Sequence, residues 1–120
     1  VVYTSESLAL AQLELLVHLP SPDVLRAYVS ILIEFDARLV EDFDVQRWPK
    51  NWMAWPAPNS TRTIGDEWVR RGDTAILRVP SVVVRTESNF LVNPGHKDFG
   101  KICIGKAQPL ALDPRLARKR

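Results

Sequence analysis

The order of apolar and polar residues at the start of the chain predicts a strand followed by a helix. Residues 1–3 read as a short strand, and an almost continuously apolar run predicts a helix over 6–19. Thr4 and Ser5 are expected to cap the exposed amides at the start of that helix, because their side-chain oxygens accept hydrogen bonds. Pro20 is expected to end it, since proline lacks the N–H donor that a continuing helix needs.

The clearest alternation of apolar and polar side chains covers residues 25–35. A period of two over this length predicts a strand with one face toward the core. Four shorter strands are predicted farther along, over 75–79, 82–84, 89–92 and 101–104. Pro80 separates the first two of them, because proline cannot donate to a sheet ladder and marks a strand end, an edge or a bulge.

Between these strands lies a segment that is rich in tryptophan and proline. Its composition over 45–59 predicts an irregular loop packed by large aromatic side chains. Ser60 is then expected to cap a second helix that runs through Trp68, and Gly72 is expected to close it. Helices flanked by runs of strands, without regular strand–helix alternation, indicate the α+β class with a small mixed or antiparallel sheet and flanking helices.

The composition is that of a globular domain with nearly balanced charge. The 120 residues are 46% hydrophobic and 25% charged, and a single domain over 1–120 is expected. Lysine and arginine number 16 and the acids 14, which gives a net charge of +2. Several bases gather at Arg115, Arg118, Lys119 and Arg120. No aromatic residues are interleaved with them, so a solvated segment is favoured over a nucleic-acid site.

The single cysteine, Cys103, excludes a disulfide or a cysteine-based zinc site within the chain and fits a reducing compartment. The longest apolar run, 8–19, contains polar residues such as Glu14 and is too short to span a bilayer. A secretory signal is absent as well, so we expect a cytoplasmic protein. Because the chain opens in mid-strand at Val1 without an initiator methionine, residues before Val1 are expected to be missing.

Polar residues on the first predicted helix are candidates for chemistry, because almost all of its other residues are apolar. Ser7, Glu14 and His18 fall in one stripe at about 100° per residue. The stripe can face solvent, with Glu14 and His18 as a surface pair four residues apart. It can also face a cleft, where Glu14 supplies a carboxylate and His18 is its partner.

Other catalytic and metal-binding patterns are weak or absent in the sequence. The chain has no glycine-rich phosphate loop, no His-Glu-x-x-His helix and no Gly-x-Ser-x-Gly elbow. A Ser81–His96 pair is conceivable, but its spacing does not support a hydrolase triad. Glu41, Asp42 and Asp44 form an acidic cluster that could hold a divalent ion, but their place after a strand end favours a solvated turn, and no metal site is predicted.

Five segments spread over nearly the whole chain carry a family resemblance. They are Val-Val-Tyr-Thr-Ser-Glu-Ser at 1–7, Ala-Gln-Leu-Glu-Leu-Leu-Val-His-Leu at 11–19, Ser-Thr-Arg-Thr-Ile-Gly-Asp-Glu-Trp at 60–68, Leu-Arg-Val-Pro-Ser-Val-Val-Val at 77–84 and Asn-Phe-Leu-Val-Asn-Pro-Gly-His at 89–96. In this order they resemble the signature blocks of RES-domain proteins, the toxins of bacterial Xre/RES toxin–antitoxin pairs. The resemblance implies a fold similar to ADP-ribosyltransferase toxins, degradation of NAD, and inhibition by an Xre-type antitoxin with a helix-turn-helix domain.

The resemblance also implies three site residues. The family glutamate falls on Glu14 as the catalytic residue, the active-site tyrosine on Tyr3 and the family serine on Ser81, the last two as contacts to NAD. An arginine is implied before Val1, and this sequence does not contain it. The alternative function is a non-catalytic protein-binding module of a toxin–antitoxin complex.

These residue types suit cleavage of the nicotinamide–ribosyl bond. The transition state places positive charge on the ribose, as in glycoside cleavage, and a fixed carboxylate such as Glu14 stabilises that charge. Tyr3 offers a flat ring on which nicotinamide can stack, and Ser81 offers a hydroxyl donor for a phosphate or carboxamide. Water, phosphate and a protein side chain can all attack the same sugar carbon, so hydrolysis, phosphorolysis and ADP-ribosyl transfer stay open.

Overall fold

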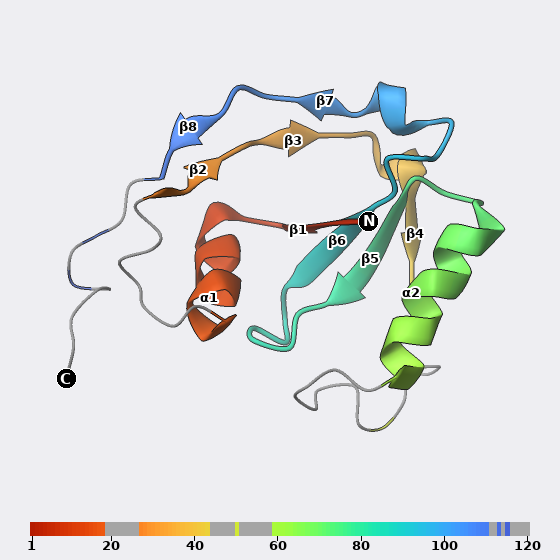
Figure 1. Cartoon of the computed structure of the whole chain (residues 1–120), viewed down its shortest axis with the longest axis horizontal. Coiled ribbons are helices and arrows are strands. Elements are labelled where there is room, and N and C mark those ends of the chain that lie inside the picture. Colours follow the sequence, from red (N-terminus) through yellow and green to blue (C-terminus); the bar gives the residue numbers. More distant parts are fainter. Residues whose placement is uncertain (19–26, 44–49, 51–58, 111–112, 114, 116–120) are drawn as a thin grey trace.

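In the computed structural model of the chain (Figure 1), the described residues are 1–18, 27–43, 50, 59–110, 113 and 115. The side chains of His18 and of residues 59–62 are outside this description. Most of the predicted loop over 45–59 and the bases at 118–120 fall outside the described residues, as does Pro20.

A four-stranded mixed sheet forms the body of the molecule. Its strands are β1 (Val2–Ser5), β4 (Val40–Asp42), β5 (Ile76–Pro80) and β6 (Ser88–Val92). The order across the sheet is β1-β6-β5-β4, with β4 parallel to β5 and the other neighbours antiparallel. Together with two helices, this mixed sheet confirms the predicted α+β class, although the sequence pattern does not predict β4.

Helix α1 (Leu8–His18) follows β1 and begins at a different cap from the predicted one. The Ser7 hydroxyl accepts a hydrogen bond from the Leu10 N–H at 3.1 Å. Thr4 and Ser5, predicted as caps, instead lie in β1 and bond across the strand to β6. That prediction was wrong because β1 runs on to residue 5, which leaves Ser7 as the residue before the first helical turn.

Helix α2 (Asn59–Arg71) packs against the two middle strands of the sheet. Its Trp68 is almost fully buried, and it lies on apolar side chains of β5 and β6, namely Leu77, Val79 and Leu91. Gly72 has a φ of +65°, and its N–H donates to the Trp68 carbonyl at 3.1 Å, so the predicted helix end is confirmed. Among the described helices, none is long and apolar enough to cross a membrane.

The opposite face of the sheet carries a second apolar cluster. Its buried members are Ala75, Ile76, Val92 and Ile102, and the half-buried residues packed on them are Ile33, Phe35, Leu39, Val40, Phe90 and Phe99. Two short 3-10 helices, η2 (Ala37–Leu39) and η4 (Phe99–Lys101), supply Leu39 and Phe99 to this cluster. Since side chains alternate along a strand, β5 and β6 contribute to both clusters.

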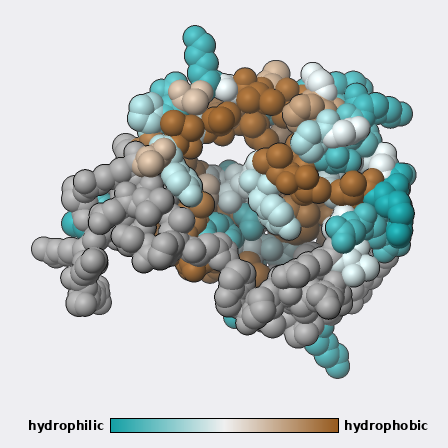
Figure 2. Space-filling view, in the orientation of Figure 1, coloured by the Kyte–Doolittle hydropathy of each residue, from teal (hydrophilic) through white to brown (hydrophobic). Residues whose placement is uncertain are grey.

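A narrow antiparallel ribbon runs beside the sheet (Figure 1). It pairs β2 (Val29–Ser30) with β8 (Gln108–Pro109), and β3 (Ile33–Glu34) with β7 (Cys103–Ile104). Several of its apolar side chains are exposed, namely Val29, Ile31, Leu32 and Ile104. In Figure 2, apolar surface borders part of a hollow in the middle of this view, mainly above it and to its right.

The continuous strand predicted over 25–35 was wrong, because a bulge interrupts it. Two residues, 31 and 32, separate β2 from β3, whereas three residues, 105–107, separate β7 from β8. The Gly105 N–H donates to the Leu32 carbonyl at 2.8 Å, and an added Cβ at Gly105 would lie only 2.9 Å from that oxygen. The absence of a side chain at Gly105 permits this close approach and the extra residue.

Residues 82–84 form bends after β5, so the strand predicted there was wrong. The Ser81 hydroxyl accepts hydrogen bonds from the N–H groups of Val83 at 3.1 Å and Val84 at 3.0 Å. The Glu87 N–H donates to the Val84 carbonyl at 2.9 Å and closes the connection to β6. These local bonds take up amides that a strand would offer to a neighbour, and they override the strand preference of the valines.

Candidate functional site

Glu14, in the middle of α1, bonds to residues from two other elements. Its Oε1 accepts a hydrogen bond from the Ser81 hydroxyl at 2.7 Å and another from the Asn89 side-chain amide at 2.9 Å. Ser81 directly follows β5, and Asn89 lies in β6. The Glu14 carboxylate therefore points toward the sheet and is not a surface group paired only with solvent.

Ser81 is held so that its hydroxyl has a single orientation. The residue is fully buried, its N–H donates to the Glu87 carbonyl at 2.9 Å, and its Oγ accepts the two amide bonds of the following turn. A hydroxyl has one proton and two lone pairs. Both lone pairs are occupied, so the proton points at Glu14 and Ser81 orients the carboxylate.

Asn89 completes the hydrogen-bonded cluster, although the sequence analysis did not single it out. Its Oδ1 accepts a hydrogen bond from the Ser5 hydroxyl at 2.9 Å, while its Nδ2 donates to Glu14. Ser5 and Asn89 are directly opposite in the β1–β6 pairing. The available signal is that Asn89 shares a face of its strand with buried Leu91, and a polar side chain on such a face needs a partner.

The second oxygen of Glu14 is unused within the described part of the chain. Both hydrogen bonds fall on Oε1, and neither a lysine nor an arginine among the described residues forms an ion pair with Glu14. A carboxylate offers about four acceptor positions. Oε2 thus keeps the capacity to accept a hydrogen bond from a ligand, and no described lysine or arginine competes with a cation on that ligand for the carboxylate.

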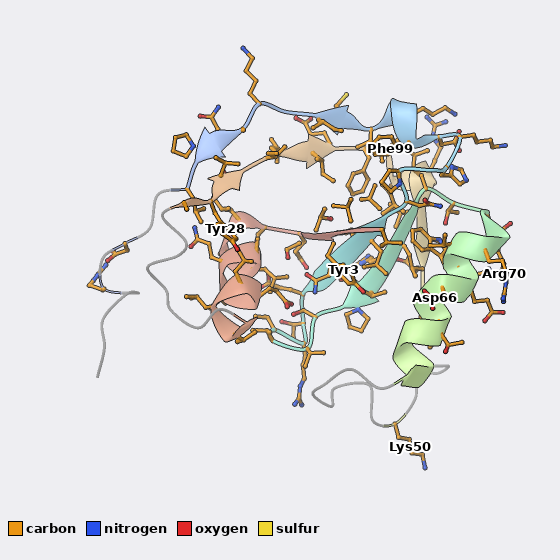
Figure 3. The ribbon with its side chains drawn as sticks, in the orientation of Figure 1. Tyr3, Tyr28, Lys50, Asp66, Arg70 and Phe99 are labelled. Atoms are coloured by element: carbon orange, nitrogen blue, oxygen red, sulfur yellow. The ribbon has the colours of Figure 1, made fainter. Side chains whose placement is uncertain are left out.

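Tyr3 lies on β1, two residues before Ser5, so both side chains leave the same face of the sheet. Tyr3 and Ser5 are therefore about 7 Å apart along the strand. The side chain of Tyr3 is 76% exposed, and Figure 3 draws it between the two helices. The ring is therefore open to solvent on the face that carries Ser5, Asn89 and Glu14.

Comparison with known proteins connects this chain to a family. The RES domain family matches residues 1–113. The chain belongs to the RES domain family. "Toxin Res" of Yersinia enterocolitica is 41% identical over 117 residues, which cover 96% of this chain and 76% of that toxin. "Prs ADP-ribosylating toxin" of Sphingobium is 36% identical over 122 aligned residues, which cover 99% of this chain and 76% of that protein.

Membership of the RES domain family agrees with the architecture. RES domains are similar in fold to ADP-ribosyltransferases, and the mixed sheet with flanking helices is consistent with that fold. Of the three site residues implied by the resemblance, this RES domain joins Glu14 and Ser81 by a direct hydrogen bond. Tyr3 stands on the same sheet face without a hydrogen bond to either of them among the described contacts.

The Ser81–His96 pair does not form in this RES domain. The Ser81 hydroxyl donates a hydrogen bond to Glu14 at one end of β5. His96 lies in the loop after Asn93, whose N–H donates to the Ala75 carbonyl at the other end of β5. The strand from Ala75 to Ser81 is roughly 20 Å long, so the two residues lie near opposite ends of β5. The His96 Nδ1 accepts the Asp98 N–H at 3.0 Å, and its buried Nε2 has no partner among the described residues.

The acidic cluster at 41–44 is partly explained by neighbouring arginines. Glu41 accepts from Arg71 at 3.2 Å, and Asp42 lies 3.7 Å from Arg78. Asp42 is in β4, so the turn expected there was wrong, and Asp44 falls outside the described residues. In the portion of the chain that the structure describes, no three His, Cys, Asp or Glu side chains are grouped to hold a metal ion.

Proposed function

We propose that this RES domain is a toxin that cleaves the nicotinamide–ribosyl bond of NAD, with Glu14 as its catalytic residue. The observation that carries the proposal is the arrangement of Glu14: Oε1 is fixed by two donors, while Oε2 and the negative charge are uncommitted among the described residues. The names of the relatives support it, because three of them are called "Toxin Res" and another is called an ADP-ribosylating toxin. ADP-ribosylation consumes NAD.

The carboxylate suits this reaction because bond cleavage leaves positive charge on the ribose ring. Oε2 of Glu14 accepts a hydrogen bond from a ribose hydroxyl. The charge of the carboxylate stabilises the growing positive charge more strongly in the transition state than in the bound substrate. Two fixed donors hold the carboxylate in place before the substrate arrives, so little reorganisation is needed during the reaction. The rate is accelerated because Glu14 stabilises the transition state more than the bound substrate.

Tyr3 and Ser81 take different parts in the proposal. The exposed ring of Tyr3 is a surface on which nicotinamide stacks, beside the bond that breaks. Ser81 was expected from the resemblance to contact NAD, but its only proton is used by Glu14. To donate to NAD it would have to release the carboxylate, so we assign Ser81 to orienting Glu14.

The partners follow from the same proposal. A toxin that destroys NAD acts in the cytoplasm and must be neutralised there, which fits a cognate Xre-type antitoxin with a helix-turn-helix domain. Water, inorganic phosphate and a protein side chain remain the three candidate acceptors for the ADP-ribosyl group. The name of the Sphingobium relative includes its target, Prs, and so favours a protein acceptor for that relative.

The proposal is tested by incubating the purified protein with NAD and measuring released nicotinamide. We expect Glu14→Gln to lower the rate by about 100-fold or more, because glutamine can accept from Ser81 and Asn89 but carries no charge. Glu67→Gln, at an exposed position of α2, is the matched control and should leave the rate unchanged. Parallel reactions without phosphate, with phosphate and with a candidate target protein identify the acceptor.

Equal nicotinamide release by Glu14→Gln and the unsubstituted protein would refute Glu14 as the catalytic residue. An unsubstituted protein that binds a helix-turn-helix antitoxin but releases no nicotinamide would favour the alternative of a non-catalytic binding module.

A further inference from the structure

The orientation of the Asn89 amide determines whether a hydrogen-bond donor or an acceptor faces the Glu14 carboxylate. An asparagine side chain presents two donors at Nδ2 and an acceptor at Oδ1, and its two ends have nearly the same shape. In the orientation observed, Nδ2 donates to Glu14 at 2.9 Å. Turned by half a rotation, the amide would set its carbonyl oxygen against a carboxylate oxygen, and an attractive contact would become a repulsive one.

Ser5 is the residue that holds the other end of this amide. Its hydroxyl donates to Oδ1 of Asn89 at 2.9 Å, and the two residues are directly opposite in the antiparallel pair β1–β6. Opposite residues on one face of an antiparallel pair have their Cβ atoms about 5 Å apart. The backbone pairing therefore brings the hydroxyl to the amide, and both ends of the Asn89 side chain are held.

We propose that Ser5 is a positioning residue for Glu14 and that it acts through Asn89: its hydroxyl keeps the Asn89 amide turned so that Nδ2 points at the carboxylate. This inference rests on the proposed function, since it concerns the same carboxylate. Ser5 itself makes no hydrogen bond to Glu14 among the described contacts, so its effect on the reaction must pass through Asn89.

The neighbouring residue Thr4 provides a matched control. Its hydroxyl donates to the Phe90 carbonyl at 2.8 Å, so it also links β1 to β6 by a side-chain hydrogen bond. Because side chains alternate along a strand, Thr4 faces the side of the sheet that does not carry Glu14. Thr4→Val removes this cross-strand bond and leaves the Asn89 amide untouched.

The experiment is a double-mutant cycle on NAD cleavage with nicotinamide release as the readout. We expect Ser5→Ala to lower kcat about tenfold with a KM for NAD within about twofold of the parent, because positioning is lost and Tyr3 is intact. Asn89→Ala should lower kcat at least as much. Ser5→Ala should then have no further effect in the Asn89→Ala background, since the two residues act as one unit. Ser5→Thr should restore kcat, and Thr4→Val should leave it unchanged.

Three results would overturn the positioning role. They are independent, multiplying effects of Ser5→Ala and Asn89→Ala, no effect of Ser5→Ala on kcat, or an equal loss of kcat in Thr4→Val. If the unsubstituted protein releases no nicotinamide, the proposed function fails instead. In that case NMR tests whether Ser5 holds the Asn89 amide. Hydrogen exchange of the Asn89 side-chain NH2 should be faster in Ser5→Ala than in the parent, and unchanged exchange would overturn the positioning role of Ser5.

Discussion

The two faces of the four-stranded sheet are built from alternate residues of the same strands, but their buried side chains differ in kind. One face combines the Trp68 cluster with the polar group of Ser5, Glu14, Ser81 and Asn89. The other face carries the apolar cluster of Ala75, Ile76, Val92 and Ile102, in which Ile76 is 0% exposed. A sheet can thus separate the residues that we propose for chemistry from those that form the apolar core.

The polar face is tolerated because its side chains satisfy one another. Burying a polar group costs free energy unless it finds a partner. Ser81, Asn89 and the Oε1 atom of Glu14 each have one. Oε2 of Glu14 is not among the buried atoms that lack a partner in the described part of the chain, and it is the atom that we propose for substrate. Substitutions on this face should therefore change catalysis, whereas substitutions on the apolar face should change the free energy of unfolding.

The largest loss of stability is expected on the apolar face. Ile76→Ala should lower the free energy of unfolding by about 2–5 kcal/mol, because it leaves a cavity among Ala75, Val92 and Ile102. Denaturant unfolding measures this loss. Leu32→Ala, at a residue that is 70% exposed, is the control and should change stability by no more than about 0.5 kcal/mol. Nicotinamide release per folded molecule should be unaffected by either change. A fall in that rate for Ile76→Ala would mean that the two faces are coupled.

The sequence predicted the middle of the sheet better than its edges. β5 and β6 contribute buried apolar residues to both faces of the sheet, so the local pattern is enough to predict them as strands. β4 is three residues long and includes two acids, and its place follows from parallel pairing with β5, a contact that no local pattern encodes. At 82–84 the valines indicated a strand, but the Ser81 hydroxyl captured two of their amides.

The candidate site was also predicted in part, but mainly from the family resemblance and not from a local pattern of apolar residues. Helical spacing placed Ser7, Glu14 and His18 in one stripe but left open which way the stripe faced. The family resemblance named Glu14 and Ser81, which are 67 residues apart and meet by a hydrogen bond. Asn89 was missed because a single polar residue in a strand produces no periodic signal, and its importance depends on what α1 places above it.

Ser81→Ala should have an intermediate effect on stability. Of the substitutions discussed in these paragraphs, it is the one expected to change both the free energy of unfolding and kcat. It removes the donor to Glu14, and it also leaves the amides of Val83 and Val84 without their acceptor. We expect a loss of about 1–2 kcal/mol in the free energy of unfolding, together with a lower kcat for NAD. Ser88→Ala is the control, because the Ser88 hydroxyl meets Arg78 at an exposed position. If Ser81→Ala changed stability alone, the assignment of Ser81 to orienting Glu14 would be wrong.

The smallest effect on stability is expected at Asp36, an exposed carboxylate beyond the edge of the apolar cluster. A side-chain hydrogen bond from Arg38, and then its backbone N–H, lowers the pKa of Asp36 from 3.8 to about 2. Because this pKa is lower in the folded state, the stabilisation is complete above about pH 4 and is lost as the pH falls through 2. Asp36→Asn should shift the thermal midpoint at pH 7 by about 2 °C at most, since exposed ion pairs are screened by water.

The pH dependence gives the Asp36 prediction its sharpest form. The difference between Asp36→Asn and the parent should shrink between pH 4 and pH 2, where the parent carboxyl takes up its proton, and thermal unfolding at several pH values measures it. Asp36 and Glu14 are both carboxylates held by two kinds of donor, but only Glu14 is half-buried and bonded to a fully buried serine. A midpoint shift for Asp36→Asn as large as that for Ser81→Ala would mean that burial does not set the strength of these contacts, and the contrast between the interior and the surface would fail.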